Sequence, residues 1–267
     1  MKTIAWWSAG VTSAVACKLA FDKYSVDNVR AVYIHIDSAH PDNERFKRDC
    51  EEWYGKEIET IKSLKYTDQF DAIQKGTGSY VNGPKGAPCT TYLKKDVRVH
   101  FEKENEYTNQ VFGFEYSKNE INRAIRFIEQ HPNTKPLFPL IDEKLTKESC
   151  LKILLTEGIE IPKMYQLGFN NNNCVGCVKG GMGYWNLIRE LFPETFDKMS
   201  ELEKSKGHSC IKGMFLKDLK PGTGRLPKID IPDCSLFCDL EFTDVLDDKT
   251  EKILQDKLKI SDITNGY

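Results

Sequence analysis

Residues 3–13 read Thr3-Ile4-Ala5-Trp6-Trp7-Ser8-Ala9-Gly10-Val11-Thr12-Ser13. The first five are apolar or β-prone, which predicts a short buried strand. The pattern from Ala14 to Tyr24 predicts an amphipathic helix that starts near Ser13. The intervening loop consists of small residues, whose backbone N–H groups and hydroxyls can close on an anion at the positive end of the helix. We expect that anion to be a phosphate.

The next segments repeat this strand–helix alternation. Residues 29–37 predict a second buried strand, and a helix is expected from about Asn43. Such an order implies a right-handed parallel βαβ unit, in which ligands bind at the carboxyl ends of the strands. Asp37 and Ser38 would stand at that edge, beside the loop of residues 8–13. Further strands are expected at 56–61 and 110–114, and further helices at 68–74, 88–105, 117–131, 145–158, 184–191 and 194–205. The sequence therefore predicts an α/β fold with a doubly wound, mainly parallel sheet.

Length and composition favour an ordinary globular protein. The 267 residues suffice for one large domain or a domain with an appendage, and the net charge is −2. No apolar run reaches the roughly 18 residues that span a bilayer, and the amino terminus lacks a signal-peptide pattern. We expect a cytoplasmic protein that does not bind a membrane. Residues 198–228 carry eight basic against three acidic side chains, which indicates a solvated basic face or the approach of an anionic substrate.

Nine cysteines in a reducing compartment favour metal binding or thiol chemistry over disulfides. Cys174-x-x-Cys177 bounds a short turn whose two sulfurs can face one ion, and Gly176 relieves the strain of that turn. Zinc or a 4Fe–4S cluster would each accept such ligands. Further thiols are available at Cys89, Cys210, Cys234 and Cys238, whereas Cys17, Cys50 and Cys150 lie on expected helices as buried free thiols. At a helix start, Cys89 would have a stabilised thiolate.

The loop at residues 8–13 resembles the pyrophosphate loop (PP-loop) of the adenine nucleotide α-hydrolase superfamily, whose pattern is Ser-Gly-Gly-x-x-Ser. Ala9 replaces one glycine, and Thr12 stands where many ATP-using members carry an acid. The resemblance implies that Asp37 and Ser38 hold the nucleoside. It also implies that the phosphates are held by Ser8, Ala9, Gly10, Thr12 and Ser13.

A second resemblance covers roughly residues 3–183. The PP-loop is followed by a cysteine and Leu93-Lys94, then by Pro162-x-x-Tyr165-x-x-Gly168 and the Cys-x-x-Cys pair. This order is similar to the phosphoadenosine phosphosulfate (PAPS) reductase family, especially its iron–sulfur branch. The resemblance implies a 4Fe–4S cluster on Cys89, Cys174 and Cys177. It leaves the fourth ligand to one of three thiols, Cys210, Cys234 or Cys238. The iron–sulfur branch has a cysteine pair where this chain has Cys89 alone.

The same resemblance suggests catalytic roles. Lys94 would neutralise developing phosphate charge, Cys89 would also serve as a reactive thiol, and Cys234 loosely matches the tail cysteine of the reductases. The implied activity is ATP-dependent adenylation and sulfur transfer, with Mg²⁺ accompanying ATP. Two alternatives are a sulfonucleotide reductase that releases sulfite and a non-catalytic nucleotide-binding subunit with structural zinc.

Domain organisation and partners complete these expectations. We expect a nucleotide-binding domain at 1–168 and a cysteine-rich region at 169–267. Expected partners are the nucleotide, a sulfur or thiol donor protein, a nucleic-acid acceptor for the sulfur and a second copy in a homodimer. No recognisable nucleic-acid module accompanies the basic segment.

Overall fold

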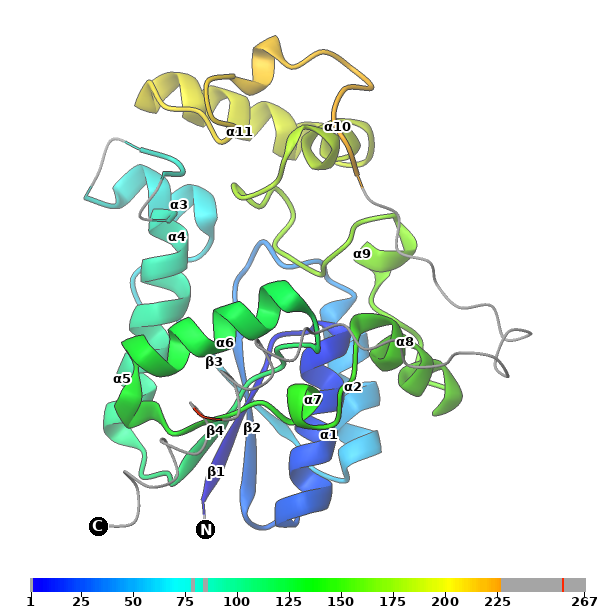
Figure 1. Cartoon of the computed structure of the whole chain (residues 1–267). Coiled ribbons are helices and arrows are strands. Elements are labelled where there is room, and N and C mark those ends of the chain that lie inside the picture. Colours follow the sequence, from blue (N-terminus) through cyan, green and yellow to red (C-terminus); the bar gives the residue numbers. More distant parts are fainter. Residues whose placement is uncertain (1, 78–79, 84–85, 227–255, 257–267) are drawn as a thin grey trace.

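The computed structural model describes residues 2–77, 80–83, 86–226 and 256. Its centre is a five-stranded, all-parallel sheet with the strand order β3-β2-β1-β4-β5 (Figure 1). The strands are β1 (Thr3–Trp7), β2 (Val29–His35), β3 (Ile58–Lys62), β4 (Asn109–Val111) and β5 (Pro136–Leu137). The prediction of an α/β fold is confirmed. The sequence did not reveal β5, because two residues beginning with proline carry no strand periodicity.

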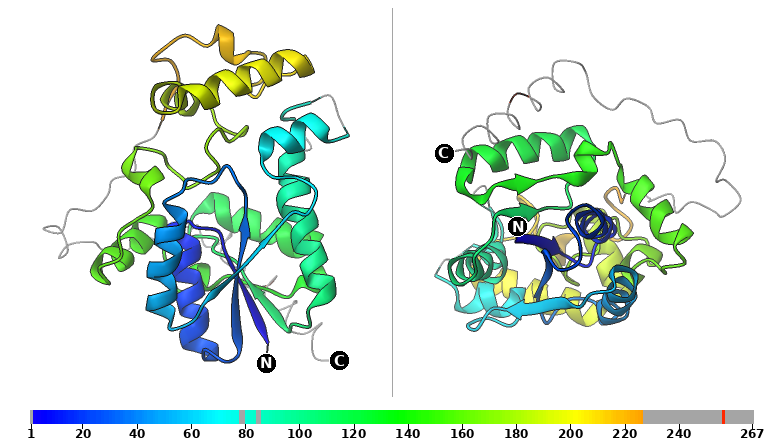
Figure 2. Two further views of the ribbon diagram at one scale, coloured as in Figure 1. Left: turned by 180° about the vertical axis from the view of Figure 1, so that it is seen from behind. Right: turned by 90° about the horizontal axis from the view of Figure 1, so that it is seen from below.

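Helices cover both faces of this sheet, as a doubly wound fold requires (Figures 1 and 2). Alternate residues of β1 enter two separate cores, because successive side chains of a strand point to opposite faces. Ala5 and Trp7 pack with α1 (Val11–Tyr24), α2 (Asn43–Tyr54) and α8 (Lys147–Thr156). On the other face, Ile4 and Trp6 pack with α5 (Asp96–Glu104) and α6 (Lys118–Gln130).

The start of α1 lies three residues earlier than expected. Gly10 occupies the N-cap position, and Ser13 is buried within the first helical turn. Ala9, the residue before this N-cap, adopts a positive φ of 59°. That left-handed conformation costs an alanine roughly 1 kcal/mol, and it occurs where the PP-loop pattern has glycine.

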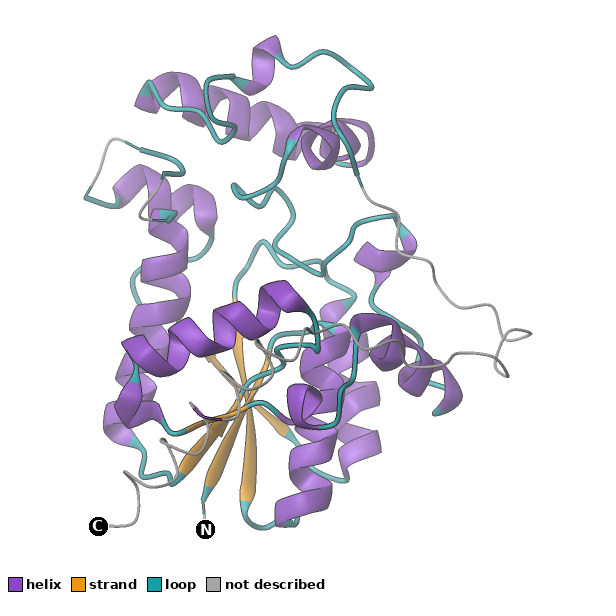
Figure 3. Ribbon diagram, in the orientation of Figure 1, coloured by secondary structure: helices purple, strands orange, loops and turns teal. Residues whose placement is uncertain are grey.

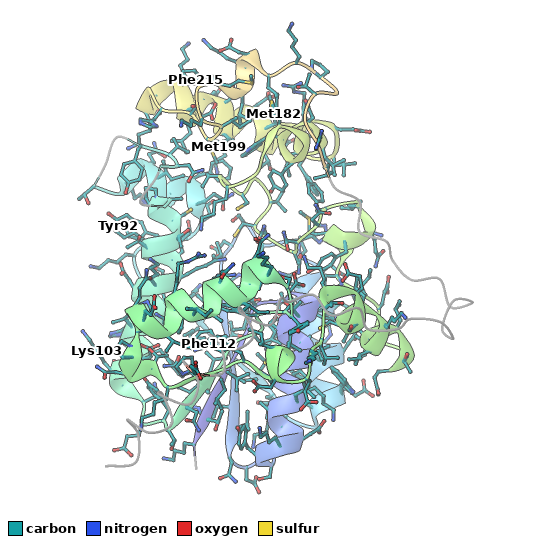
Figure 4. The ribbon with its side chains drawn as sticks, viewed as in Figure 1. Tyr92, Lys103, Phe112, Met182, Met199 and Phe215 are labelled. Atoms are coloured by element: carbon teal, nitrogen blue, oxygen red, sulfur yellow. The ribbon has the colours of Figure 1, made fainter. Side chains whose placement is uncertain are left out.

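A third core stands above the carboxyl edge of the sheet. It includes residues of α3 (Gln69–Lys75), α9 (Lys163–Gln166), α10 (Met182–Leu191) and α11 (Pro193–Lys206) (Figure 3). In Figure 4, the labelled Met199 belongs to this third core. The labelled Phe112 belongs to the core between the sheet and helices α5 and α6. Because α3 belongs to residues 1–168, the third core joins both of the expected regions. The boundary at residue 168 stays a prediction.

The remaining helical segments are short. They comprise α4 (Pro88–Thr90), the π-helix η1 (Thr91–Lys95), η2 (Pro132–Thr134), α7 (Pro139–Asp142) and η3 (Leu216–Asp218). α4, η1 and α5 follow one another without a break, in place of the single helix expected at 88–105. Among the helices that the structure describes, none combines the length and apolar character needed to cross a bilayer.

Candidate functional site

The main cavity has a volume of about 400 Å³ and opens at the carboxyl ends of β1 and β2. Ser8 enters it from the PP-loop, Lys94 from η1 and Cys174 from the cysteine pair. Three segments that are distant in sequence therefore contribute to one cavity. This edge of a parallel sheet is where ligands of such folds bind.

The charge of the cavity wall is positive. Among the described residues, five cationic side chains and no acidic one line it: Lys94, Lys95, Arg98, Arg123 and Arg126. Arg98 and Arg123 also lie within ion-pair distance of Glu102 and Glu120. The guanidinium of Arg123 lies 4.3 Å from the ring centre of Phe114, which orients it by a cation–π contact. Burial and the nearby Arg98 lower the pKa of His131, another lining residue. A ligand that fills this cavity is therefore expected to be an anion.

The PP-loop is held by its own serines. The Oγ of Ser13 accepts hydrogen bonds from the backbone N–H of Ser8 at 3.0 Å and from the Ser8 hydroxyl at 3.1 Å. It donates to the carbonyl oxygen of Gly10 at 2.9 Å. Ser8 is the loop residue that lines the main cavity, whereas Ala9 is fully buried beneath it. The two serines thus keep the loop compact.

Two residues outside the loop, Tyr165 and Asn172, form hydrogen bonds with its backbone. The buried hydroxyl of Tyr165 accepts hydrogen bonds from the backbone N–H groups of Val11 and Asn172, and burial raises its pKa to about 12. The Nδ2 of Asn172 donates to the carbonyl oxygen of Ala9 at 2.6 Å and to Oδ1 of Asn43 at 2.7 Å. Tyr165 belongs to the Pro162-x-x-Tyr165-x-x-Gly168 pattern, whereas the sequence analysis assigned no role to Asn172.

Gly113, which follows β4, is a further residue that sequence reasoning missed. A Cβ atom at this position would lie 2.6 Å from Cα of Ser13 and 2.7 Å from its backbone nitrogen. The chain after β4 therefore packs directly against the first turn of α1. A glycine within an expected strand was the available signal, since it often marks close backbone approach.

The expected nucleoside contacts lie just outside the lining of the main cavity. Oδ1 of Asp37 stands 3.4 Å from Nε2 of His35. The Ser38 hydroxyl is hydrogen-bonded to Gln69, and the Ser38 carbonyl accepts from the backbone N–H of Val175 at 2.9 Å. Ser38 therefore supports the cysteine turn. In this part of the chain the cavity is lined instead by Tyr33, Ile34, Ile36 and Ala39.

The cysteine turn itself is tightly fixed. Gly176 has a φ of +80°, which supports the expectation that glycine relieves strain there. The Tyr184 hydroxyl accepts from the backbone N–H of Cys177 at 2.8 Å and donates to the carbonyl of Cys174 at 3.0 Å. Nε2 of Gln69 donates to the carbonyl of Val175 at 2.8 Å. These bonds hold the turn in place from two elements, α3 and α10.

Two further cysteines, Cys89 and Cys210, lie near the cysteine pair of this turn. Burial raises the pKa of Cys89 to about 11, and the nearby Cys177 and Cys174 contribute. Burial and Glu203 raise the pKa of Cys210, to which Cys177 and Cys89 add. Burial therefore opposes the stabilised thiolate that the position of Cys89 at a helix start predicts.

The donor set fits a thiolate-bound metal in kind and number. Asn82 links two of its segments, since its Nδ2 donates to the carbonyls of Val178 at 3.2 Å and Cys210 at 3.3 Å. Within the described ranges, however, no three His, Cys, Asp or Glu side chains are arranged to hold an ion. Cys234 and Cys238 lie outside the described residues.

An all-parallel sheet with this cavity is compatible with a Rossmann-like nucleotide-binding fold. No family model matches the chain. The chain is 24% identical over 231 residues to an uncharacterized protein of Methanocaldococcus jannaschii. That similarity covers 84% of this chain and 54% of the archaeal protein, so the chain spans about half the length of its relative.

Proposed function

We propose that this protein catalyses adenine-nucleotide-dependent sulfur chemistry, in the form of ATP-dependent adenylation and sulfur transfer. The observation that carries the proposal is the single cavity lined by Ser8, Lys94 and Cys174. It combines a PP-loop serine, a cation and a member of the cysteine pair. The positive wall suits the triphosphate, and the aromatic residues Trp6 and Phe112 offer surfaces for the base.

In the proposed reaction, an oxygen of the acceptor attacks the α-phosphorus of ATP, and the bond to pyrophosphate breaks. A sulfide then attacks the adenylated carbon, and AMP leaves with the bonding electron pair. Lys94 and Arg123 would neutralise the charge that develops on the phosphate oxygens. Asp37 and Ser38 remain the proposed nucleoside contacts.

Cys89, Cys174 and Cys177 would hold a metal centre. Cys210 is the candidate for the fourth ligand among the described thiols, because Cys89 and Cys177 lie close enough to raise its pKa. A 4Fe–4S cluster there would supply an iron site for sulfur, whereas zinc would be structural. Mg²⁺ would accompany ATP.

A sulfonucleotide reductase is the second candidate. It is favoured because none of the described residues that line the main cavity is acidic. A phosphosulfate nucleotide can be neutralised by lysine and arginine alone, whereas Mg²⁺ requires oxygen ligands. In this reaction the thiolate of Cys234, the candidate nucleophile, attacks the sulfur of the phosphosulfate, and the S–O bond breaks with the nucleotide phosphate as the leaving group. A thiol of a donor protein then attacks the Cys234 sulfur, which releases sulfite and forms a mixed disulfide, and a second donor thiol resolves that disulfide.

The deciding experiment is anaerobic purification with metal and sulfide analysis, followed by incubation with each nucleotide. AMP and pyrophosphate from ATP would support sulfur transfer, and sulfite from PAPS would support the reductase. Stoichiometric zinc without turnover would contradict both and leave a nucleotide-binding subunit. Lys94→Ala should lower turnover at least tenfold. Lys103→Ala is the matched control, because Lys103 is an exposed lysine outside the cavity (Figure 4).

A further inference from the structure

Gln69, the first residue of α3, has a polar side chain inside the protein, and only 2% of its surface is exposed. An amide in such a place needs hydrogen-bond partners at both ends, because an unpaired buried polar group is costly. The partners of Gln69 lie on two segments that are distant in sequence. These are the loop after β2 and the cysteine turn.

Gln69, Ser38 and Val175 form a closed ring of three hydrogen bonds. The Ser38 hydroxyl donates to Oε1 of Gln69. Nε2 of Gln69 donates to the carbonyl of Val175 at 2.8 Å, and the backbone N–H of Val175 donates to the carbonyl of Ser38 at 2.9 Å. The amide has one orientation, because the carbonyls of Val175 and Gly176 near its nitrogen can only accept. One buried side chain therefore joins the loop after β2 to the cysteine turn.

The ring adjoins the main cavity at two points. Ala39 follows Ser38, Cys174 precedes Val175, and both Ala39 and Cys174 line that cavity. The N–H that Val175 donates belongs to the peptide group that joins it to Cys174, so the ring restrains the backbone of Cys174 itself. Gln69 is not among the described residues that line the cavity. A change at Gln69 would therefore reach a ligand there through the positions of Cys174 and Ala39.

We propose that Gln69 is a positioning residue that fixes the Cys174 thiol in the wall of the main cavity. The inference rests on the proposed function, for which it names the side chain that sets the place of the sulfur site relative to the nucleotide. A displacement of about 1 Å between reacting groups can cost roughly 10²-fold in rate. The amide of Gln69 opposes such a displacement because it holds the turn and the loop after β2 at once.

The test measures how fast iodoacetamide alkylates each cysteine of the full-length protein, by peptide mass spectrometry, without oxygen and at equal metal content. Gln69→Met keeps an unbranched side chain of similar length and removes both hydrogen bonds. It should raise the alkylation rate of Cys174 about tenfold, because a buried hydrogen bond that restrains the turn is lost. Gln74→Met is the matched control and should leave that rate unchanged, since Gln74 is an exposed glutamine of the same helix. An unchanged rate in Gln69→Met would overturn the inference.

Two buried thiols distinguish positioning from a general loss of structure. Cys17 and Cys50 lie in the core against the sheet, away from the ring. Their alkylation rates in Gln69→Met should equal those of the unmodified protein. If they rise as much as the rate of Cys174, Gln69 merely stabilises the fold and the inference is overturned.

Gln69→Glu supplies a pH profile that does not depend on the folding of Gln69→Met. A protonated carboxyl can accept from Ser38 and donate to Val175, as the amide does, whereas a carboxylate can only accept. Since burial raises the pKa of a carboxyl, the useful range is about pH 6 to about pH 9. The alkylation rate of Cys174, divided by that of the unmodified protein at the same pH, should rise as the carboxyl ionises. A ratio near one over the whole range would contradict a role for the Gln69 donor.

Steady-state kinetics separate this inference from the proposed function. Gln69→Met should lower kcat about tenfold or more and leave the KM for ATP within about threefold, because Gln69 acts through Cys174 and does not line the cavity. A higher KM with unchanged kcat would overturn the inference. Failure of the unmodified protein to bind or use ATP would overturn the proposed function alone, since alkylation of Cys174 requires no nucleotide. Normal turnover of ATP with unchanged alkylation in Gln69→Met would overturn this inference alone.

Discussion

The side chain of Asn172 donates a 2.6 Å hydrogen bond to the carbonyl oxygen of Ala9, and so joins the segment before the cysteine pair to the PP-loop. Asn172 stands two residues before Cys174, and Ala9 is the strained residue of the loop. One hydrogen bond therefore links the PP-loop directly to the segment that leads into the cysteine pair.

Asn172→Ala is expected to weaken ATP binding about tenfold, because a lost buried hydrogen bond costs about 1 to 3 kcal/mol and frees the loop. Isothermal titration calorimetry measures the effect. The control is Asn171→Ala, since Asn171 is an exposed neighbour whose side chain contacts Lys147. Equal affinities in the two variants would show that Asn172 does not position the loop.

Gly113→Ala should disturb the same loop from the side of β4. The new methyl group would overlap the backbone of Ser13, and overpacking of this kind costs about 1 to 3 kcal/mol. We expect a lower melting temperature and weaker ATP binding. Gly83→Ala is the matched control, because its nearest neighbour would be 3.7 Å away. If Gly113→Ala were as stable as the unmodified protein, the close approach of Gly113 to the Ser13 backbone would be contradicted.

Glu115→Gln should stabilise the protein at neutral pH. Burial raises the pKa of Glu115 above its ordinary value of 4.5, and Oε2 has no hydrogen-bond partner among the described residues. A raised carboxyl pKa means that the folded state holds the proton more tightly than the unfolded state does. The charged form therefore costs stability as the pH rises above 4.5.

Thermal unfolding at two pH values checks whether the charged form of Glu115 lowers stability as the pH rises. The melting temperature of Glu115→Gln should exceed that of the unmodified protein at pH 7 by about 2 to 4 °C for each kcal/mol. The difference should vanish near pH 4, where the carboxyl is neutral in both states. The exposed Glu157→Gln serves as control. A gain that persists at low pH would indicate a cause other than charge burial.

Cys210→Ser should abolish metal binding if Cys210 is the fourth ligand. Its backbone N–H donates to Glu203 and its carbonyl accepts from Asn82. The serine hydroxyl can replace the thiol in its hydrogen bond with the Glu203 side chain, so the local fold should persist. Metal analysis of Cys210→Ser, Cys234→Ser and Cys238→Ser decides between the described thiol and those of the tail. Retention in Cys210→Ser with loss in Cys238→Ser would assign the ligand to the tail.

The amino-acid sequence by itself determined the class of fold and most of its helices. β1 and the first βαβ unit follow from short apolar runs and small-residue turns, because strand and helix periodicities are local properties of the chain. The same is true of Gly176, whose place inside Cys-x-x-Cys already indicates a positive φ. The short β5 and the early start of α1 escaped prediction, since packing rather than periodicity sets them.

Only the tertiary structure decided which residues meet. It placed Ser8, Lys94 and Cys174 in one cavity, moved Ser38 to the support of the cysteine turn and gave Asn172, Tyr165 and Gly113 their roles. It also raised the pKa of Cys89, where a helix start alone predicts the reverse. The physical reason is that burial, desolvation and hydrogen bonds between distant segments arise only when the chain closes on itself.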